Sequence, residues 1–295
     1  MKKIRFAIGF LAIASTAIAI FFVLRSDIAL LTHPKGIIAR SELELIATIF
    51  FHLLIIIVPT FVLLFVTLGR TQSKHSKYNP EISHGVLGGW ILWTIPTVIV
   101  VSMAFITWHA THKLDPYRPL QSEMKPLAIQ VVALDWKWLF IYPEQGIAAV
   151  NFVQFPAGRP IHFLLSADGS PMNSFWISQL SGQIYSMTGM TTSLHLMADG
   201  PGKYTGRASE INGEGYADMT FVVQSTSPSD FDDWVAAVKQ SPLQLTETVY
   251  NELVKPSINH PTLFYSSVEN DLFNQIVMKY MHPMATLWKI SYLEN

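Results

Sequence analysis

The chain has 295 residues, half of them hydrophobic and only 14% charged, with a formal net charge of −1. A soluble globular domain carries about 25% charged residues, so part of this chain is expected to lie outside water. The near-zero net charge gives no reason to expect nucleic acid as a partner. The absence of cysteine excludes disulfides, thiolate zinc sites and iron–sulfur clusters.

Three long apolar stretches occupy the first 110 residues. They run from Phe6 to Leu24, from Leu45 to Leu68 and from Trp90 to Trp108. Each has about 19–24 residues without Asp, Glu, Lys or Arg, enough for a helix to cross a hydrocarbon core of about 30 Å. The second and third predict a transmembrane hairpin within residues 41–110, with spans at about 45–68 and 90–108.

The first stretch has two interpretations. It follows a basic cluster and contains Ala17-Ile18-Ala19, a small-residue pattern typical of signal-peptide cleavage. Its apolar run is longer than the usual core of a signal peptide. Residues 1–26 are therefore either a cleaved signal peptide or a retained signal-anchor helix.

Basic residues near the spans predict the orientation in the membrane, because basic loops tend to stay cytoplasmic. The two loops that flank the second span carry three basic residues each, so the loops alone give no answer. The cluster of Lys2, Lys3 and Arg5 breaks the tie and predicts a cytoplasmic N-terminus. A multi-pass membrane protein is expected, with everything after Trp108 outside the cytoplasm, which in a bacterial inner membrane is the periplasmic side.

Short strand patterns replace the apolar runs after residue 126. The candidate strands are Leu127–Leu134, Trp136–Tyr142, Ile161–Ser166, Ser193–Met197 and Met219–Gln224. Turn signals with Gly or Pro separate them, including Asp168-Gly169 and Asn212-Gly213. This spacing predicts an all-β sandwich or small barrel, and residues 126–225 have the length of one domain.

Residues 228–295 are predicted to form a helical C-terminal extension. One helix is expected over Ser229–Gln240, capped by Ser227 or Ser229. A second, short helix is expected over Asp271–Met281. Their apolar faces are expected to pack on the sandwich or on a neighbouring protein; the residues concerned are Phe231, Trp234, Val235 and Val238 in the first helix and Leu272, Phe273, Ile276 and Tyr280 in the second.

An aromatic segment in the middle of the chain carries a specific resemblance. Asp135-Trp136-Lys137-Trp138 is followed by Phe140-Ile141-Tyr142-Pro143-Glu144-Gln145-Gly146. This pattern resembles subunit II of the haem-copper oxidases, in the form found in bo-type ubiquinol oxidases. Further segments agree in order: Pro34-Lys35-Gly36, Trp93-Thr94-Ile95-Pro96, Met172-Asn173-Ser174-Phe175, Gln183-Ile184-Tyr185-Ser186-Met187-Thr188-Gly189-Met190 and Asp271-Leu272-Phe273. The resemblance runs from about Leu30 to Met281 and implies a two-helix membrane anchor followed by a cupredoxin-like sandwich.

The resemblance also implies where a copper centre would lie, and its ligands are missing. In the cytochrome c oxidases of this superfamily the sandwich holds the dinuclear copper A centre through an early His and a late cluster of Cys, Glu, Cys, His and Met. Here Asn173 stands at the early His, Ala208 and Asn212 at the two Cys and Tyr216 at the late His, while Glu210 and Met219 remain. A bridged copper pair needs soft thiolates. The chain is therefore expected to have no metal-binding, cofactor-binding or catalytic residues of its own.

The missing copper has a functional consequence. Copper A accepts electrons from cytochrome c, so a complex without it is expected to oxidise ubiquinol and to have no cytochrome c partner. The resemblance implies that subunit I carries haem b, haem o or a, and copper B, and reduces oxygen to water in a proton-pumping oxidase of the aerobic respiratory chain. This chain is then expected to stabilise and cap subunit I, with subunits III and IV as further partners. The alternative is a free-standing, membrane-tethered cupredoxin-like binding or assembly protein.

Several positions carry narrower hypotheses. Family members have a Glu at the mouth of the proton-conducting K-channel, where this chain has Gly89; Glu81 or His84 substitutes for it, or subunit I lines the entrance. His52 lies mid-span and is expected to be a neutral His hydrogen-bonded between helices rather than a quinone contact. Trp136 is expected to be a packing residue.

The histidines in or after the sandwich are expected to be solvated or hydrogen-bonded rather than metal ligands. They are His162, His195, His260 and His282, and they lack metal-ligand spacing.

Overall fold

The computed structural model describes residues 33–71, 86–169 and 172–281. The predictions for residues 1–26, for Glu81, His84 and His282, and for most of the loop after Arg70 lie outside the described residues. The chain forms two compact units. One is Ser41–Asp115, and the other joins the residues before Ser41 to those after Asp115.

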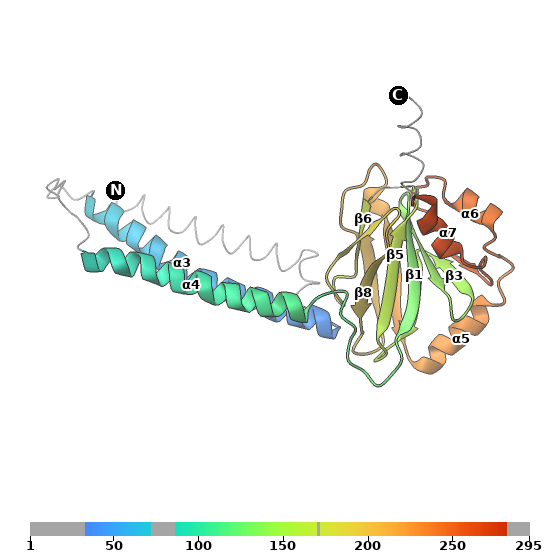
Figure 1. The fold of residues 1–295 in the computed structure, drawn as a ribbon, viewed down its shortest axis with the longest axis horizontal. Helices are drawn as coiled ribbons and strands as arrows, with labels where there is room; N and C mark the ends of the chain where they lie inside the picture. The colour runs from blue at the N-terminus through green and yellow to red at the C-terminus, as the bar shows by residue number, and fades with distance from the viewer. Residues whose placement is uncertain (1–32, 72–85, 170–171, 282–295) are drawn as a thin grey trace, which may run out of the picture. The chain divides into compact units, whose positions relative to one another are not determined.

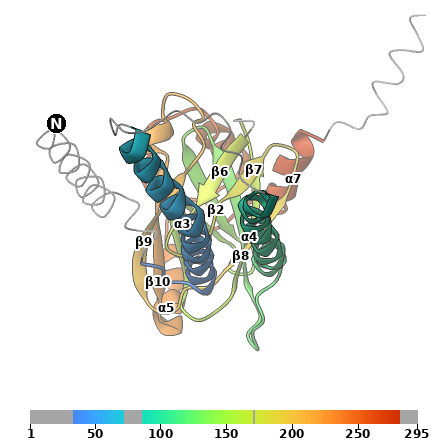
Figure 2. The same cartoon turned by 90° about the vertical axis from the view of Figure 1, so that its left-hand side faces the viewer.

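Two helices make up the smaller unit. α3 (Ile37–Thr71), whose first turn belongs to the larger unit, and α4 (Val86–Lys113) run antiparallel (Figure 1), and Figure 2 shows them as two separate helices. Apolar segments of 30 residues in α3 and 21 residues in α4 are long enough to cross a membrane. The two helices contain both predicted spans and extend beyond them at each end.

Each membrane helix has an interior proline followed by a threonine that bonds back to the helix. Thr60 Oγ1 donates to the Ile56 carbonyl at 2.7 Å, one residue after Pro59. Thr97 Oγ1 donates to the Trp93 carbonyl at 2.7 Å, one residue after Pro96. Each hydroxyl bonds to the carbonyl next to the one that the proline leaves without an amide donor. Both helices continue past their prolines.

The larger unit is a sandwich of two sheets, as the strand pattern predicts. One sheet has six strands in the order β11-β3-β2-β1-β5-β8, and the other has five in the order β4-β10-β9-β6-β7. The pairs β1/β5 and β4/β10 are parallel, and all other pairs among the described strands are antiparallel. The bounds are β1 Leu127–Leu134, β2 Lys137–Tyr142, β3 Ile147–Val150, β4 Phe152–Pro156, β5 Ile161–Ala167, β6 Met172–Trp176, β7 Ile184–Met187, β8 Thr192–Leu196, β9 Gly202–Ala208, β10 Thr220–Thr226 and β11 Leu263–Tyr265.

The six-stranded sheet is apolar on both faces. Alternate residues of β1, such as Ile129 and Val131, face the main core between the sheets. The intervening residues Val132 and Leu134 belong to a second cluster on the outer face. An antiparallel sheet with one solvated face would be polar there, so this sheet requires a cover.

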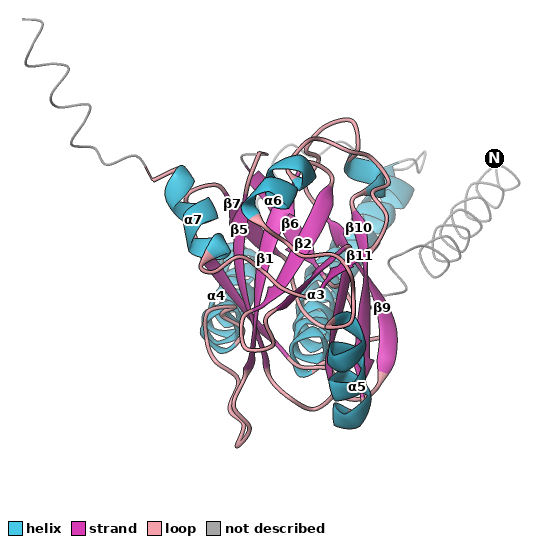
Figure 3. Ribbon diagram, turned by 90° about the vertical axis from the view of Figure 1, so that its right-hand side faces the viewer, coloured by secondary structure: helices cyan, strands magenta, loops and turns pink. Residues whose placement is uncertain are grey.

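The C-terminal extension supplies that cover. It consists of α5 (Pro228–Val238), α6 (Glu247–Leu253), β11 and α7 (Leu272–Lys279). Residues of α6 and α7 complete the outer cluster, and Figure 3 shows both helices beside the strands of this sheet. The completing residues of the extension are Leu245, Tyr250, Leu253, Tyr265, Leu272, Phe273, Ile276 and Val277.

Both predicted helices of the extension are present with small shifts in their ends. Ser227 is the residue that caps α5, because its Oγ accepts from the Asp230 amide at 3.1 Å. The predicted face of α5 is confirmed, with Trp234 only partly buried. In α7 the predicted face is confirmed except for Tyr280, which lies just past the helix and makes polar contacts instead. Helix α6 and strand β11 were not predicted.

Candidate functional site

The residues at the expected copper position meet at the start of β6, the end of β9 and the loop before β10. Asn173 and Met219 are fully buried, and Ala208 is nearly so. The Asn212 amide donates from Nδ2 to Asn173 Oδ1 and also to Met219 Sδ, the latter at 3.1 Å. Three of the six residues at the expected copper position are thus joined to one another by hydrogen bonds.

The other residues of the expected set lie apart from this contact. The side chain of Ala208 carries no donor atom, and the side chains of Glu210 and Tyr216 make no hydrogen bond within the described residues. Tyr216 packs against the main core from a short 3-10 turn, Tyr216–Asp218.

This set of donors does not fit a dinuclear copper centre. Two amides, a thioether and a methyl group replace the thiolates and imidazoles that such a centre requires. The Met219 sulfur accepts a hydrogen bond, and Asn173 Nδ2 and Asn212 Oδ1 are buried without a partner in the described part of the chain. Amide contacts that need no metal therefore occupy the position.

Hydrogen bonds between side chains fix the start of the loop over residues 209–219. Ser174 Oγ donates to Gln183 Oε1 at 3.1 Å and shares a 2.7 Å hydrogen bond with Ser209 Oγ. Ser209 also donates to Gln183 Oε1. These bonds link the segment before β7 to β6 and to the end of β9.

Trp136 covers the same loop, in agreement with its expected packing role. Its backbone has φ of 63°, which turns the indole out of the strand that follows. A Cβ added at Gly215 would lie 2.4 Å from Trp136 Cγ, so the indole rests directly on the loop backbone. Gly213, with φ of 124°, adopts a conformation that favours glycine.

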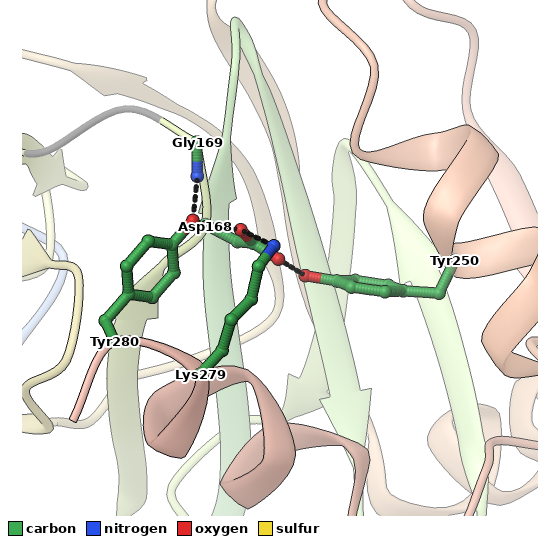
Figure 4. A network of polar contacts seen from close by, with 5 residues as sticks. All are labelled: Asp168, Gly169, Tyr250, Lys279 and Tyr280. Atoms are coloured by element: carbon green, nitrogen blue, oxygen red, sulfur yellow. Dashed lines mark hydrogen bonds and ion pairs between the residues drawn. The ribbon is translucent and has the colours of Figure 1, made fainter. Parts of the chain in front are cut away.

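A second polar constellation joins the sandwich to the C-terminal extension (Figure 4). The buried Asp168 carboxylate, at the end of β5, accepts from Tyr250 at 2.7 Å, from Lys279 at 2.8 Å and from Tyr280 at 2.5 Å. Tyr280 Oη in turn accepts from the Gly169 amide at 3.2 Å. We call Asp168, Tyr250, Lys279 and Tyr280 the Asp168 clasp.

The clasp keeps a charged carboxylate in a buried place. Burial by itself raises the pKa of Asp168, but hydrogen bonds from Lys279, Tyr280 and Tyr250 outweigh it, so the pKa lies below the ordinary value. Burial, and after it the charge of Asp168, raise the pKa of Tyr250. The ion pair between Asp168 and Lys279 and two tyrosine hydroxyls therefore persist together at neutral pH.

Two further polar contacts hold the extension. Lys137 is buried, and its Nζ donates at 2.7 Å both to the Lys255 carbonyl and to Ser257 Oγ. Asn151 Nδ2 donates to the His260 carbonyl at 2.8 Å. The aromatic segment thus splits its roles, with Trp136 on the loop, Lys137 on the extension and Trp138 in the main core.

Three of the four predicted histidines lie within the described residues and are hydrogen-bonded, and two of these, His162 and His195, form a pair that the sequence did not predict. His162 of β5 and His195 of β8 lie opposite each other, with ring centroids 4.2 Å apart and planes 9° apart. His195 Nδ1 lies 3.0 Å from the Pro116 carbonyl, and His162 Nε2 lies 2.6 Å from Ser193 Oγ. Burial, followed by the charge on His195, lowers the pKa of His162.

The structure also bears on two positions in the membrane helices, His52 and Gly89. His52 Nδ1 lies 2.8 Å from the Thr48 carbonyl of its own helix, and a hydrogen bond from its other ring nitrogen to a neighbouring helix stays a prediction. A Cβ added at Gly89 meets no described atom within 4 Å, which leaves that position open. What replaces the family's Glu there stays a hypothesis.

Known proteins resemble this chain along most of its length. The family model described as the COX aromatic rich motif matches residues 239–284. The chain is 47% identical to cytochrome bo(3) ubiquinol oxidase subunit 2 of Pseudomonas aeruginosa, over 85% of this chain and 76% of that protein. It is 43% identical to ubiquinol oxidase subunit 2 of Acetobacter aceti, over 85% of this chain and 83% of that protein.

A solved structure also matches the chain at 18% identity. It is the periplasmic domain of subunit II of the cytochrome oxidase of Bradyrhizobium japonicum, with a TM-score of 0.38, covering 41% of this chain and 96% of that one. The high identity to the two sequence relatives decides the assignment. The chain belongs to the subunit 2 family of the ubiquinol oxidases, within the haem-copper oxidases, and is a subunit of a terminal quinol oxidase.

Proposed function

We propose that this chain is a non-redox subunit II that stabilises and caps subunit I, while electrons pass from ubiquinol directly to subunit I. The carrying observation is the hydrogen-bonded group of Asn173, Asn212 and Met219 at the expected copper position. The amide side chains of Asn173 and Asn212 fill this space, and they cannot supply the thiolates that bridge a copper pair. The sandwich is therefore a structural domain in a complex whose redox cofactors sit in subunit I.

The two membrane helices support a role in binding subunit I. Large apolar side chains are exposed around both helices, including Phe61 and Phe65 on α3 and Phe105 on α4. Lipid covers some of this surface, and the remainder is available for packing against transmembrane helices of a partner. Subunit I is the proposed main partner, and subunits III and IV are proposed to complete the complex.

The orientation and cofactors belong to the same proposal. The sandwich lies on the periplasmic side, because the basic cluster Lys2, Lys3 and Arg5 favours a cytoplasmic N-terminus. Subunit I carries haem b, haem o or a, and copper B, and the complex pumps protons as it reduces oxygen to water.

The test is a pull-down of the full chain through a C-terminal tag in mild detergent. Reduced-minus-oxidised spectra and ubiquinol-dependent oxygen uptake are then recorded on the eluate. The proposal predicts co-purified haem bands, ubiquinol oxidase activity, no activity with reduced cytochrome c and no copper A absorbance. A colourless, inactive chain that elutes alone from intact membranes would support the alternative of a membrane-tethered binding or assembly protein.

A further inference from the structure

A charged hollow of about 510 Å³ lies where the chain enters α3, entirely within the larger unit. One wall is the segment that contains Pro34, Lys35 and Arg40. The other walls are Gln179 and the segment Asp199–Tyr204, which includes the first three residues of β9. Two segments far apart in the sequence therefore form one concave surface.

Backbone hydrogen bonds fix the walls of this hollow. The Lys35 amide donates to the Gln179 carbonyl at 2.8 Å, and the Asp199 amide donates to the Lys35 carbonyl at 2.9 Å. Gly36 forms a β-bridge with Ala198, and a Cβ at Gly36 would lie 2.7 Å from the Met197 carbonyl oxygen. The cationic side chains thus extend from a rigid backbone rather than from a free tail.

The hollow carries three cations and one carboxylate. Arg40 pairs with Asp199 at 2.5 Å, which uses one end of a guanidinium that has five N–H donors. The ammonium groups of Lys35 and Lys203 are exposed and have no hydrogen-bond or ion-pair partner within the described residues. The site therefore has an excess of positive charge and unused donors, which suits an anion with several acceptor oxygens.

Its place on the chain indicates where that anion comes from. The predicted membrane span begins at about Leu45, so Lys35 and Arg40 precede it by ten and five residues, in the part of the chain that is expected to lie at the level of the lipid headgroups. Ile37 is 41% exposed and offers an apolar surface directly beside the cations. Cations next to apolar surface at this depth match the two parts of a phospholipid, its phosphate and the start of its acyl chains.

We propose that the hollow binds the phosphodiester headgroup of an anionic phospholipid, held by Lys35, Lys203 and the free donors of Arg40. The bound lipid joins the sandwich to the first turn of α3 and stabilises the junction between the domain and the membrane. The proposal depends on α3 crossing the membrane and is independent of how electrons enter the complex.

The test is native mass spectrometry of the delipidated, detergent-purified complex, titrated with phosphatidylglycerol. The double variant Lys35→Gln/Lys203→Gln removes two charges that face solvent and leaves the backbone bonds in place. Each basic residue near an anionic headgroup contributes about fivefold in affinity. The affinity for one phosphatidylglycerol molecule is therefore expected to fall roughly thirtyfold in the double variant.

Matched variants and probes separate the possible results. The charge-preserving variant Lys35→Arg/Lys203→Arg and the control Lys239→Gln, at the end of α5, are expected to bind like the wild type. Hydrogen exchange of residues 34–40 is expected to slow when phosphatidylglycerol binds the wild type but not the Gln variant.

Three results would overturn the proposal. The first is equal binding of phosphatidylglycerol by the wild type and the Gln variant. The second is competition by millimolar inorganic phosphate, which would assign the hollow to a soluble anion. The third is loss of subunit I from the Gln variant with lipid affinity unchanged, which would assign the cations to a protein contact.

Discussion

The Asp168 carboxylate connects two parts of the chain by accepting hydrogen bonds from three side chains of the extension. The variant Asp168→Asn keeps the shape but removes the charge that Lys279 and the two tyrosines stabilise. The extension is expected to lose about 2–3 kcal/mol of stability, since charged hydrogen bonds in buried places contribute at this level. Hydrogen exchange of the α7 amides in the purified complex measures the loss.

The matched control for this prediction is Asp232→Asn on the exposed side of α5. Asp232 makes no hydrogen bond or ion pair within the described residues, so the exchange of α7 amides should stay unchanged. Equal protection of α7 in the Asp168→Asn variant and the wild type would show that the clasp does not hold the extension.

The stacked pair of His162 and His195 predicts a dependence of stability on pH. An unfolded His has a pKa of about 6.5, and the pKa of His162 in the folded chain lies lower because of burial and the nearby His195. Below about pH 6.5 the unfolded state therefore binds more protons, and stability falls as the pH falls towards the folded pKa. The other groups at the pair are the Ser193 hydroxyl and the Pro116 carbonyl.

The measurement for this pair is the Tm of the complex between pH 7.5 and 5.5. The wild type is expected to lose stability on acidification, and His162→Gln is expected to reduce that loss. The partly exposed His260, whose Nδ1 contacts only the next residue's carbonyl, gives the control His260→Gln. If His162→Gln has the same pH profile as the wild type, the stacked pair has no role in acid sensitivity.

The sequence predicted some of these residues and missed others for a clear reason. The resemblance to the oxidase family implied the loss of copper ligands within residues 207–219, where the expected positions lie close together in the chain. The Asp168 clasp could not, since its partners lie 82 to 112 residues further along. The same holds for His162 and His195, which face each other only through the register of β5 and β8.

Among the elements, α7 covers the apolar outer face of the six-stranded sheet. Phe273 is 3% exposed there, while Met278 on the same helix is 60% exposed. The variant Phe273→Ala leaves a cavity in the outer cluster and is expected to cost about 3–4 kcal/mol. The variant Met278→Ala should change stability by less than about 0.5 kcal/mol.

Both α7 variants are compared by unfolding the purified complex in urea. The readout is the cleavage of the extension by a protease at each urea concentration. If Phe273→Ala and Met278→Ala have equal effects, the extension is a loosely attached tail rather than part of the core. The matched pair also separates packing from general effects of substitution on α7.

The accuracy of the element predictions followed the strength of each local pattern. β1 was predicted with its observed bounds, because eight residues with β-branched side chains lie between clear breaks. β3 and β4 were missed because they are short and buried on nearly every residue, so they show little alternation. The apolar cover provided by α6 was missed because its seven residues give too few turns for a helical period.

The whole molecule combines a membrane anchor with a sandwich whose side chains at the expected copper position do not fit a copper pair. Both cores are built from side chains alone, and the loop at the former copper position is held by Trp136, Gln183 and two serines. Stability that rests on packing and hydrogen bonds does not depend on metal binding, unlike that of domains whose folding is coupled to a metal. Chelators are therefore expected to leave the Tm of this chain unchanged.

The metal content of the intact oxidase tests this view. If copper B lies in subunit I and this chain binds no copper A, as proposed, the complex should contain one copper for each pair of haem irons, measured by inductively coupled plasma mass spectrometry. The chain separated from subunit I should contain no stoichiometric copper, even after incubation with excess Cu(II) and gel filtration, because no thiolate is present. Two additional coppers per complex, retained by the separated chain, would mean that Asn173, Asn212 and Met219 rearrange to bind metal.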